Sequence, residues 1–428
     1  MWPQSYAPVA GSLQLSALVA VLPVFVVLLL LGVFRKPAWV AAIAGFIASA
    51  IISVAVYNMP FVLAVSSALY GAANGMLPIG WIVFTAILLY RVTVDTGKFD
   101  IIKDSLGSVT SNRSVQALLI AFAFGAFIEG AAGFGTPVAI AAAMLAGLGF
   151  PPFLAASICL LANTAPVAFG SIGTPLVMLQ RVTNLPMDAL SADVGRLCAP
   201  ISLILPSYLM LVMGGWPGLH NLITRMPPIT PKPSPYGAPY TLNLLSASGT
   251  SCLFAVFASA LVLRVSPPRL ARLTWLTAKQ LALPLLTIAS VVALAFIMNY
   301  SGQTATLGLV AAKTGGAFPF FSTLLGWLGV FLTGSDTSAN ALFGTLQVVT
   351  ANQLGLNPVL MAAANSSGGV LGKMISLQSI AVAAAATGMA RSEESALLRF
   401  TLKHSVFLVC LLGLLAMFYT YVVPTWVR

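Results

Sequence analysis

Two matched stretches of interrupted apolar sequence constrain this chain more than any other feature. They cover residues 129–175 and 333–378. Each opens with a cluster of glycine and small or polar residues, which we call the polar cluster. It then runs through a short apolar segment to a Leu-Gly turn with a proline, and reaches an Ala-Asn pair inside a second apolar run. Asn163 pairs with Asn365 in this alignment. Two interrupted hydrophobic segments at corresponding places in two halves indicate a transporter binding site.

The apolar runs around these stretches repeatedly reach about 20 residues, enough to cross a bilayer core of about 30 Å. The chain of 428 residues is 59% hydrophobic and 7% charged, whereas soluble domains carry about 25% charged residues. The runs do not alternate apolar and polar positions as membrane β-strands would. We therefore predict an all-α polytopic membrane protein in a lipid bilayer.

The net charge of +11 does not indicate a nucleic-acid partner. The basic residues stand at the ends of apolar runs, which is the pattern of positive-inside topology. The four cysteines lie singly in apolar runs and the chain has two histidines: Cys159, Cys198, Cys252, Cys410, His220 and His404. These spacings fit neither a disulfide framework nor a metal cluster. Nothing in the sequence indicates a cofactor, and no nucleophile–base pair of an enzyme is visible.

The repeat predicts the organisation of the chain. An N-terminal repeat is expected at residues 1–215, a Pro-rich loop at 216–243 and a C-terminal repeat at 244–428. Re-entrant hairpins are expected at 115–148 and 318–350, and broken transmembrane helices at 152–179 and 360–387. The legs of the first hairpin are about 14 residues, or about 21 Å of helix, too short to cross the membrane.

The charge pattern predicts that the repeats are inverted. The first hairpin follows a basic segment ending at Arg113, whereas the second follows a span that leaves the basic loop at 264–279. The hairpins should therefore enter from opposite faces. The count of crossings nevertheless disagrees by one between Trp216 and Tyr240. Residues 61–69 are expected to be too short to cross, separate from a span at 79–94.

Three charged residues fall inside apolar segments, at the polar clusters or near the expected breaks: Glu129, Asp336 and Lys373. A charge at the bilayer centre costs at least about 2.5–3.5 kcal/mol, so a functional role is the default expectation. We predict that Lys373 binds an anion and that Asp336 or Glu129 couples to protons. The structural alternatives are an Asp336–Lys373 ion pair that joins hairpin to helix, and a Glu129 carboxylate that accepts hydrogen bonds from the backbone amides of the first polar cluster.

Small polar residues gather at the same places. Half-helix ends at mid-membrane expose N–H groups that favour an anion and C=O groups that favour a cation. Candidate substrate-binding residues are Asn163, Thr164, Asn365, Ser366 and Ser367 at the expected breaks, and Thr136, Thr337, Ser338 and Asn340 at the polar clusters. Candidate backbone hinges are Gly130, Gly133, Gly135, Gly334, Gly368 and Gly369. The alternative is ordinary helix packing through small residues.

These segments resemble the L-lactate permease family. The resemblance rests on FIEGAAGFGTP, LLANTAPVAFGSIGTP, FLTGSDTSANALF and AANSSGGVLGKMIS. It implies a secondary active transporter of the bacterial inner membrane that takes up L-lactate, or D-lactate or glycolate, by proton symport. It also places the chain near an ion-transporter superfamily with paired re-entrant hairpins, whose sodium-coupled members make sodium the rival ion. Homo-oligomerisation stays open.

The chain departs from this family in one respect. Family members carry additional spans where this chain runs directly from residue 216 to 225. An odd number of missing spans would explain the disagreement in the crossing count. Two further alternatives therefore remain at this point: a channel built from the same hairpins, and a shortened, inactive relative.

Overall fold

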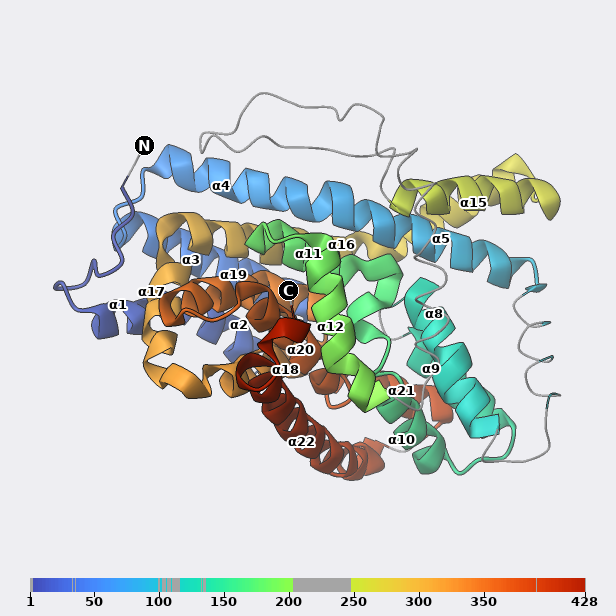
Figure 1. The fold of residues 1–428 in the computed structure, drawn as a ribbon. Coiled ribbons are helices and arrows are strands. Elements are labelled where there is room, and N and C mark those ends of the chain that lie inside the picture. Colours follow the sequence, from blue (N-terminus) through green and yellow to red (C-terminus); the bar gives the residue numbers. More distant parts are fainter. Residues whose placement is uncertain are drawn as a thin grey trace.

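The computed structural model describes residues 3–32, 34, 36–98, 101, 105, 109, 116–131, 133, 136–202, 248–389 and 391–427. This part of the chain is helical and contains no strand (Figure 1). The predicted Pro-rich loop at 216–243 lies outside the described residues, as does Gly135. Among the described residues, six helical segments are long and apolar enough to cross a membrane, or seven if one bent pair is counted as a span. The protein is a multi-pass integral membrane protein.

The described helices can be divided into two groups. The scaffold group contains α1 (Leu13–Ala20), α2 (Leu22–Gly32), α3 (Ala38–Ala55), α4 (Phe61–Asn74), α5 (Trp81–Asp95), α15 (Ser248–Val262) and α16 (Pro267–Ser301). The core group contains α8 (Gly125–Ala131), α9 (Thr136–Gly147), α10 (Pro152–Ala162), α11 (Gly170–Thr183), α12 (Met187–Ser202), α17 (Gln303–Ala311), α18 (Phe318–Thr333), α19 (Asp336–Leu354), α20 (Pro358–Lys373), α21 (Leu377–Thr387) and α22 (Arg391–Tyr421). In the scaffold group, α16 packs along α3 and α4. The two groups contact each other where α1 packs on α17 and α16 packs on α19.

The prediction that residues 61–69 form a separate short segment was wrong. Helices α4 and α5 are joined by the π-helical turn η1 (Gly75–Gly80) into one run of 35 residues. The apolar run at 61–69 is short, but the helix continues through Pro78, because the wider π-helical turn tolerates the backbone hydrogen bond that a proline cannot make. Glycines in this run allow close packing on α16, because a Cβ on Gly71 would lie 2.8 Å from the Cα of Ala293.

The predicted basic loop at 264–279 is mostly helix. Helix α16 starts at Pro267 and continues for 35 residues, or about 52 Å. The sequence from Arg269 to Lys279 contains no glycine or proline, and its leucines, alanines and lysine favour helix. The basic residues indicated an exposed segment, and Arg269, Arg272 and Lys279 are exposed. Their charge did not indicate that the backbone of this segment is helical.

Helix–turn–helix pairs occur in both regions where re-entrant hairpins were predicted. In the first, η2 (Leu118–Phe124) continues into α8, and α9 packs against both. In the second, α18 ends at Thr333 and is followed by the cap residue Gly334, whose φ of 70° is left-handed and suits glycine. The Ser335 side chain then caps α19 by accepting a hydrogen bond from the backbone N–H of Ser338. Gly133 is also left-handed, with a φ of 58°.

The first broken helix lies where the sequence placed it. Helix α10 ends at Ala162, and the next helical segment, beginning with η3 (Val167–Phe169), is bent from it by 63°. The irregular region is longer than expected, because Ser171, Ile172 and Gly173 all have left-handed backbone angles. Regular helix resumes only at Thr174.

The second broken helix corrects the prediction. Asn365, Ser366 and Ser367 lie inside the continuous helix α20, and the interruption falls at residues 374–376, before α21. Gly368 and Gly369 are therefore helical rather than hinges, and Gly130 lies within α8. The position of the second break was inferred by matching it to the first break. This inference was wrong because glycines that interrupt one helix can allow close packing of another.

Close packing of α20 on α18 explains those glycines. A Cβ on Gly368 would overlap the backbone carbonyl of Thr323, and one on Gly326 of α18 would overlap the carbonyl of Asn365. The two backbones therefore approach each other as closely as glycine allows. A side chain at either glycine would force the two helices apart. Overpacking of this kind destabilises a protein by about 1–3 kcal/mol or more.

Gly368→Ala is therefore expected to lower the free energy of unfolding by about 1–3 kcal/mol or more, measured as a lower melting temperature of the purified protein in detergent. Gly195→Ala is the matched control, because a Cβ on that α12 glycine meets nothing within 4 Å. The control should melt at or above the wild-type temperature, since alanine favours helix. Equal melting temperatures for the two variants would contradict the packing argument.

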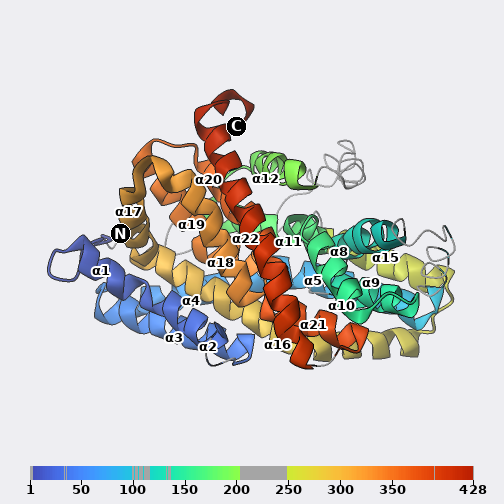
Figure 2. The ribbon, with the colours of Figure 1, turned by 90° about the horizontal axis from the view of Figure 1, so that it is seen from below.

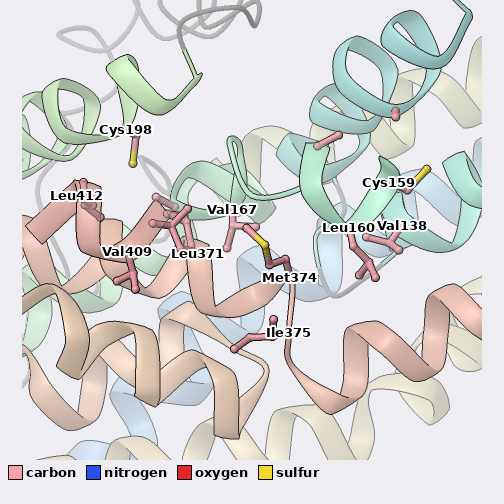
Figure 3. Packing of buried hydrophobic residues seen from close by; sticks show 14 of the residues in the cluster. Val138, Cys159, Leu160, Val167, Cys198, Leu371, Met374, Ile375, Val409 and Leu412 are labelled. Atoms are coloured by element: carbon pink, nitrogen blue, oxygen red, sulfur yellow. The ribbon is translucent and has the colours of Figure 1, made fainter. Parts of the chain in front are cut away.

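The two halves exchange partners. Helix α11 of the first broken helix packs on α19 of the second hairpin, and α21 of the second broken helix packs on α9 and α10. Figures 1 and 2 both show α21 beside α9 and α10. The largest buried apolar cluster crosses the same boundary, from Val138 and Leu160 to Leu371, Met374 and Leu412 (Figure 3). This reciprocal arrangement is the one expected of two inverted repeats.

Candidate functional site

A cavity of about 240 Å³ lies where the two halves meet. Its core-group wall comes from α8, α11, the turn of the second hairpin, the end of α20 and the start of α21. Helix α16 closes the other side with Leu283, Pro284 and Ile288. The cavity-lining side chains that carry charge or hydrogen-bonding groups include Glu129, Ser171, Thr174, Asp336, Lys373 and Gln378. Polar groups thus face an apolar wall, as in small-molecule sites generally.

Among the described residues that line this cavity, Lys373 is the cation. It is the last residue of α20, is buried, and its Nζ donates a hydrogen bond of 2.5 Å to the carbonyl of Gly334. Its charge interacts with the carboxyls of Glu129 and Asp336. Within the described part of the chain, ion pairs join Arg196 to Asp193 and Arg269 to Asp95, and none includes Lys373. An ammonium has three donors, so two remain for a ligand.

Asp336 occupies the first turn of α19, where the helix dipole favours a carboxylate. Its Oδ2 accepts hydrogen bonds from Ser366 Oγ at 2.7 Å and from Asn340 Nδ2 at 3.3 Å. Its buried Oδ1 has no hydrogen-bond partner and lies against Gly369, where a Cβ would overlap it. The two carboxylate oxygens therefore differ. Oδ2 accepts two hydrogen bonds from the protein, whereas Oδ1 accepts none and can bind a proton.

Glu129 faces the same cavity from α8. It is buried, and its Oε1 lies against Gly170, where a Cβ would be 2.6 Å away. Its Oε2 has no hydrogen-bond partner. Asn163 lies near this carboxyl, and neither polar atom of its amide has a partner that meets hydrogen-bond geometry. The first half thus presents a second buried carboxyl, less constrained than Asp336.

Two helix N-termini meet this cavity. Helix α19 begins at Asp336, and the regular part of α11 begins at Thr174, whose hydroxyl donates to the carbonyl of Ser171 at 2.6 Å. Unpaired N–H groups and the helix dipole make such ends favourable for anions. Left-handed Ser171 and Ile172 are strained for residues with a Cβ, and strain of this kind gathers at functional sites.

The predicted site residues divide into two sets. Glu129, Asp336, Thr337, Ser338, Lys373 and Gly334 line the cavity. Asn340, Asn365 and Ser366 form a buried hydrogen-bonded chain behind Asp336, Ser367 is buried in α20, and Asn163 and Thr164 are buried at the end of α10. The side chain of Thr136 lies outside the described residues. The roles of both sets as ligands stay predictions.

The sequence prediction omitted Ser171, Thr174 and Gln378, which also line the cavity. The segment GSIGTP at residues 170–175 carried a signal for the first two. Two glycines around Ser171, followed by a Thr-Pro pair, are typical of an irregular turn that starts a helix. Gln378 has no such signal, because its position follows from the interruption between α20 and α21.

Comparison with known proteins identifies the family. Residues 16–222 and 217–423 both match the L-lactate permease family. The chain belongs to this family. The L-lactate permease of Bacillus subtilis (strain 168) is 39% identical, over 96% of this chain and 97% of that protein. The L-lactate permease of Escherichia coli (strain K12) is 35% identical, over 100% and 99%. The glycolate permease GlcA of the same strain is 36% identical, over 98% of each.

Solved structures agree with the fold of this permease. MtrF of Neisseria gonorrhoeae has a TM-score of 0.57 at 13% identity, over 92% of this chain and 97% of that one. The YdaH transporter of Alcanivorax borkumensis has a TM-score of 0.54 at 17% identity, over 84% and 88%. These identities are too low to carry more than the architecture.

The permease is shorter than its relatives. The alignments to the relatives named above run over 545 to 552 residues, more than the 428 of this chain, so the relatives contain segments that it lacks. The two family matches meet at residues 217–222. That boundary lies within residues 216–225, where the sequence indicated missing spans.

Proposed function

We propose that this permease takes up L-lactate, or a closely related 2-hydroxy monocarboxylate such as D-lactate or glycolate, by proton symport across the bacterial cytoplasmic membrane. The observation that carries the proposal is the single cavity in which buried Lys373 faces two buried carboxyls, Glu129 and Asp336. This arrangement offers one cation to a monoanion and two groups that can bind a proton.

The chemistry of the lining suits such a substrate. The carboxylate would accept hydrogen bonds from Lys373 Nζ and from the N-termini of α11 and α19. The 2-hydroxyl would meet the hydroxyl groups of Ser171 or Ser338, which can donate and accept. The apolar wall of Leu283 and Ile288 would face the methyl group, which glycolate lacks. A compact ammonium serves here better than a planar guanidinium would, because the site is narrow.

The charges of the cavity support proton coupling. The ammonium of Lys373 favours the ionised form of Asp336. A lactate carboxylate beside Lys373 would compete for that ammonium, so proton binding at Asp336 Oδ1 would become more favourable. Linkage requires the reverse as well, so a proton on Asp336 would favour lactate. Proton and substrate would load together, and neither would cross alone at an appreciable rate.

Uptake of labelled lactate into proteoliposomes tests the proposal. An inward proton gradient should drive accumulation above the external concentration, and a protonophore should abolish it. A sodium gradient at equal pH on both sides should have no effect. Accumulation driven by sodium would replace the proton with its rival. Flux that never exceeds equilibration would indicate a channel, and no flux would indicate an inactive, shortened relative.

A further inference from the structure

A buried chain of amide side chains runs behind the cavity and ends at Asp336. Gln347 Nε2 donates to Asn365 Oδ1 at 3.0 Å, and Asn365 Nδ2 donates to Asn340 Oδ1 at 3.0 Å. Asn340 Nδ2 then donates toward Asp336 Oδ2 at 3.3 Å. Gln347, Asn365 and Asn340 are fully buried. The chain joins α19 to α20 and does not line the cavity.

Backbone carbonyls at both ends fix the direction of every amide in this chain. Asn340 Nδ2 faces the carbonyl of Pro175 at 3.1 Å, and Gln347 Nε2 faces that of Ser322 at 3.4 Å. A carbonyl only accepts hydrogen bonds, so both NH₂ groups must point toward these oxygens. An inverted Asn340 would place its own oxygen against the Pro175 carbonyl and against Asp336.

Asn340 shares its two amide hydrogens among three acceptors. These are the Pro175 carbonyl, Ser366 Oγ at 3.0 Å and Asp336 Oδ2. Pro175 belongs to α11 of the first half, whereas the other two acceptors belong to the second half. The same turn of α11 lines the cavity through Ser171, Thr174 and Pro175. A substrate that shifts this turn would change how much of the amide is left for Asp336.

We propose that Asn340 is a positioning residue that couples the placement of α11 against the substrate to the protonation of Asp336. This inference rests on the proposed proton symport and assigns the route by which the first half of the permease influences the carboxyl of the second. When α11 withdraws, the Asn340 amide donates to Asp336 and favours proton release. When α11 approaches, the Pro175 carbonyl takes the hydrogen and Asp336 holds its proton.

Other groups act on Asp336 and must be held constant in a test. Lys373 and Glu129 line the same cavity as Asp336, Ser366 donates a hydrogen bond to it, and the thiol of Cys198 on α12 lies near it. The test therefore changes Asn340 alone and keeps these groups. Thr345→Val is the matched control, because Thr345 on α19 likewise donates to a backbone carbonyl of α11, that of Val182 at 2.7 Å.

The experiment measures proton-driven lactate uptake and lactate–lactate exchange against external pH in proteoliposomes. Asn340→Leu removes a donor from the ionised carboxyl, so Asp336 should keep its proton to higher pH. The pH of half-maximal uptake should move by about one unit toward alkaline values. Exchange should continue, and Thr345→Val should keep the wild-type midpoint. Asn340→Ala, which adds no bulk between the helices, should give the same shift if the leucine variant does not fold.

A combined variant supplies the decisive comparison. With Asp336→Asn already present, Asn340→Leu should no longer alter the pH dependence of exchange, since residues that act through one another are not additive. An unchanged midpoint in both Asn340 variants, or an equal shift in Thr345→Val, would overturn the inference. Absence of any pH response in the wild type would instead refute the proposed proton symport, so the two failures are distinguishable.

Discussion

Replacement of Lys373 by alanine is expected to abolish lactate binding and uptake. Lys373 is a buried cation that lines the cavity and faces two carboxyls. Its loss would leave an anionic substrate opposite Glu129 and Asp336 with no compensating charge. A hydrogen bond to a charged group contributes about 1.5–3 kcal/mol, and the added repulsion should bring the loss of affinity to at least about 100-fold. Binding is measured by calorimetry with the purified permease.

Two further variants show whether charge alone is sufficient. Lys373→Arg should also fail, because a guanidinium fork replaces a compact ammonium that already donates to the Gly334 carbonyl. Lys403→Ala should behave as wild type, because Lys403 is exposed on α22. Normal uptake by Lys373→Ala would show that this lysine only ties α20 to the turn of the second hairpin.

Asp336→Asn is expected to lose uphill uptake driven by a pH gradient while it keeps exchange of lactate for lactate. The asparagine preserves the shape of the side chain and can accept from Ser366, but it cannot carry a proton across the membrane. Exchange needs no net change in protonation, so it should persist. Both activities are measured side by side in the same proteoliposomes, with protein reconstituted at equal density.

Glu129→Gln is the companion variant. If Glu129 carries the proton, the loss of uphill uptake with preserved exchange should appear in this variant and not in Asp336→Asn. If Asp336 only anchors the second hairpin, its variant should lose both activities and melt at a lower temperature. Full proton-driven uptake in both variants would refute a carboxyl-based mechanism. The unpartnered Oδ1 of Asp336 and Oε2 of Glu129 are the atoms that this comparison tests.

The sequence predicted the features that depend on local composition. Leg length and glycine placement predicted two helix–turn–helix pairs. The Asn163 region predicted the first break, because a run of proline, glycine and hydroxyl residues disfavours a regular helix there. The three intramembrane charges were recognised by their cost alone, and the structure brings them to one cavity. Each of these inferences uses only a few neighbouring positions.

Features that depend on partners far along the chain were not predictable in this way. Whether Gly368 breaks α20 or packs it against α18 depends on Thr323, which is 45 positions away in sequence. Whether Pro78 ends a helix depends on the π-helical turn that accommodates it. The cavity wall from Leu283 to Ile288 depends on how α16 crosses the core group, and the local sequence of α16 contains no polar motif that would indicate it.

The exchange of partners between the halves has a consequence for biosynthesis. Helix α9 ends at Gly147, whereas its partner α21 begins at Leu377, about 230 residues later. At about 5–20 residues per second, α9 waits on the order of 10 to 50 seconds for that partner. During this interval the carboxyl of Glu129 and the amide of Asn163 lie in a half-made protein without the second half to shield them. We expect the nascent permease to remain with the insertion machinery until α21 has been made, and chains truncated before Leu377 to be degraded rather than to accumulate as a folded N-terminal half.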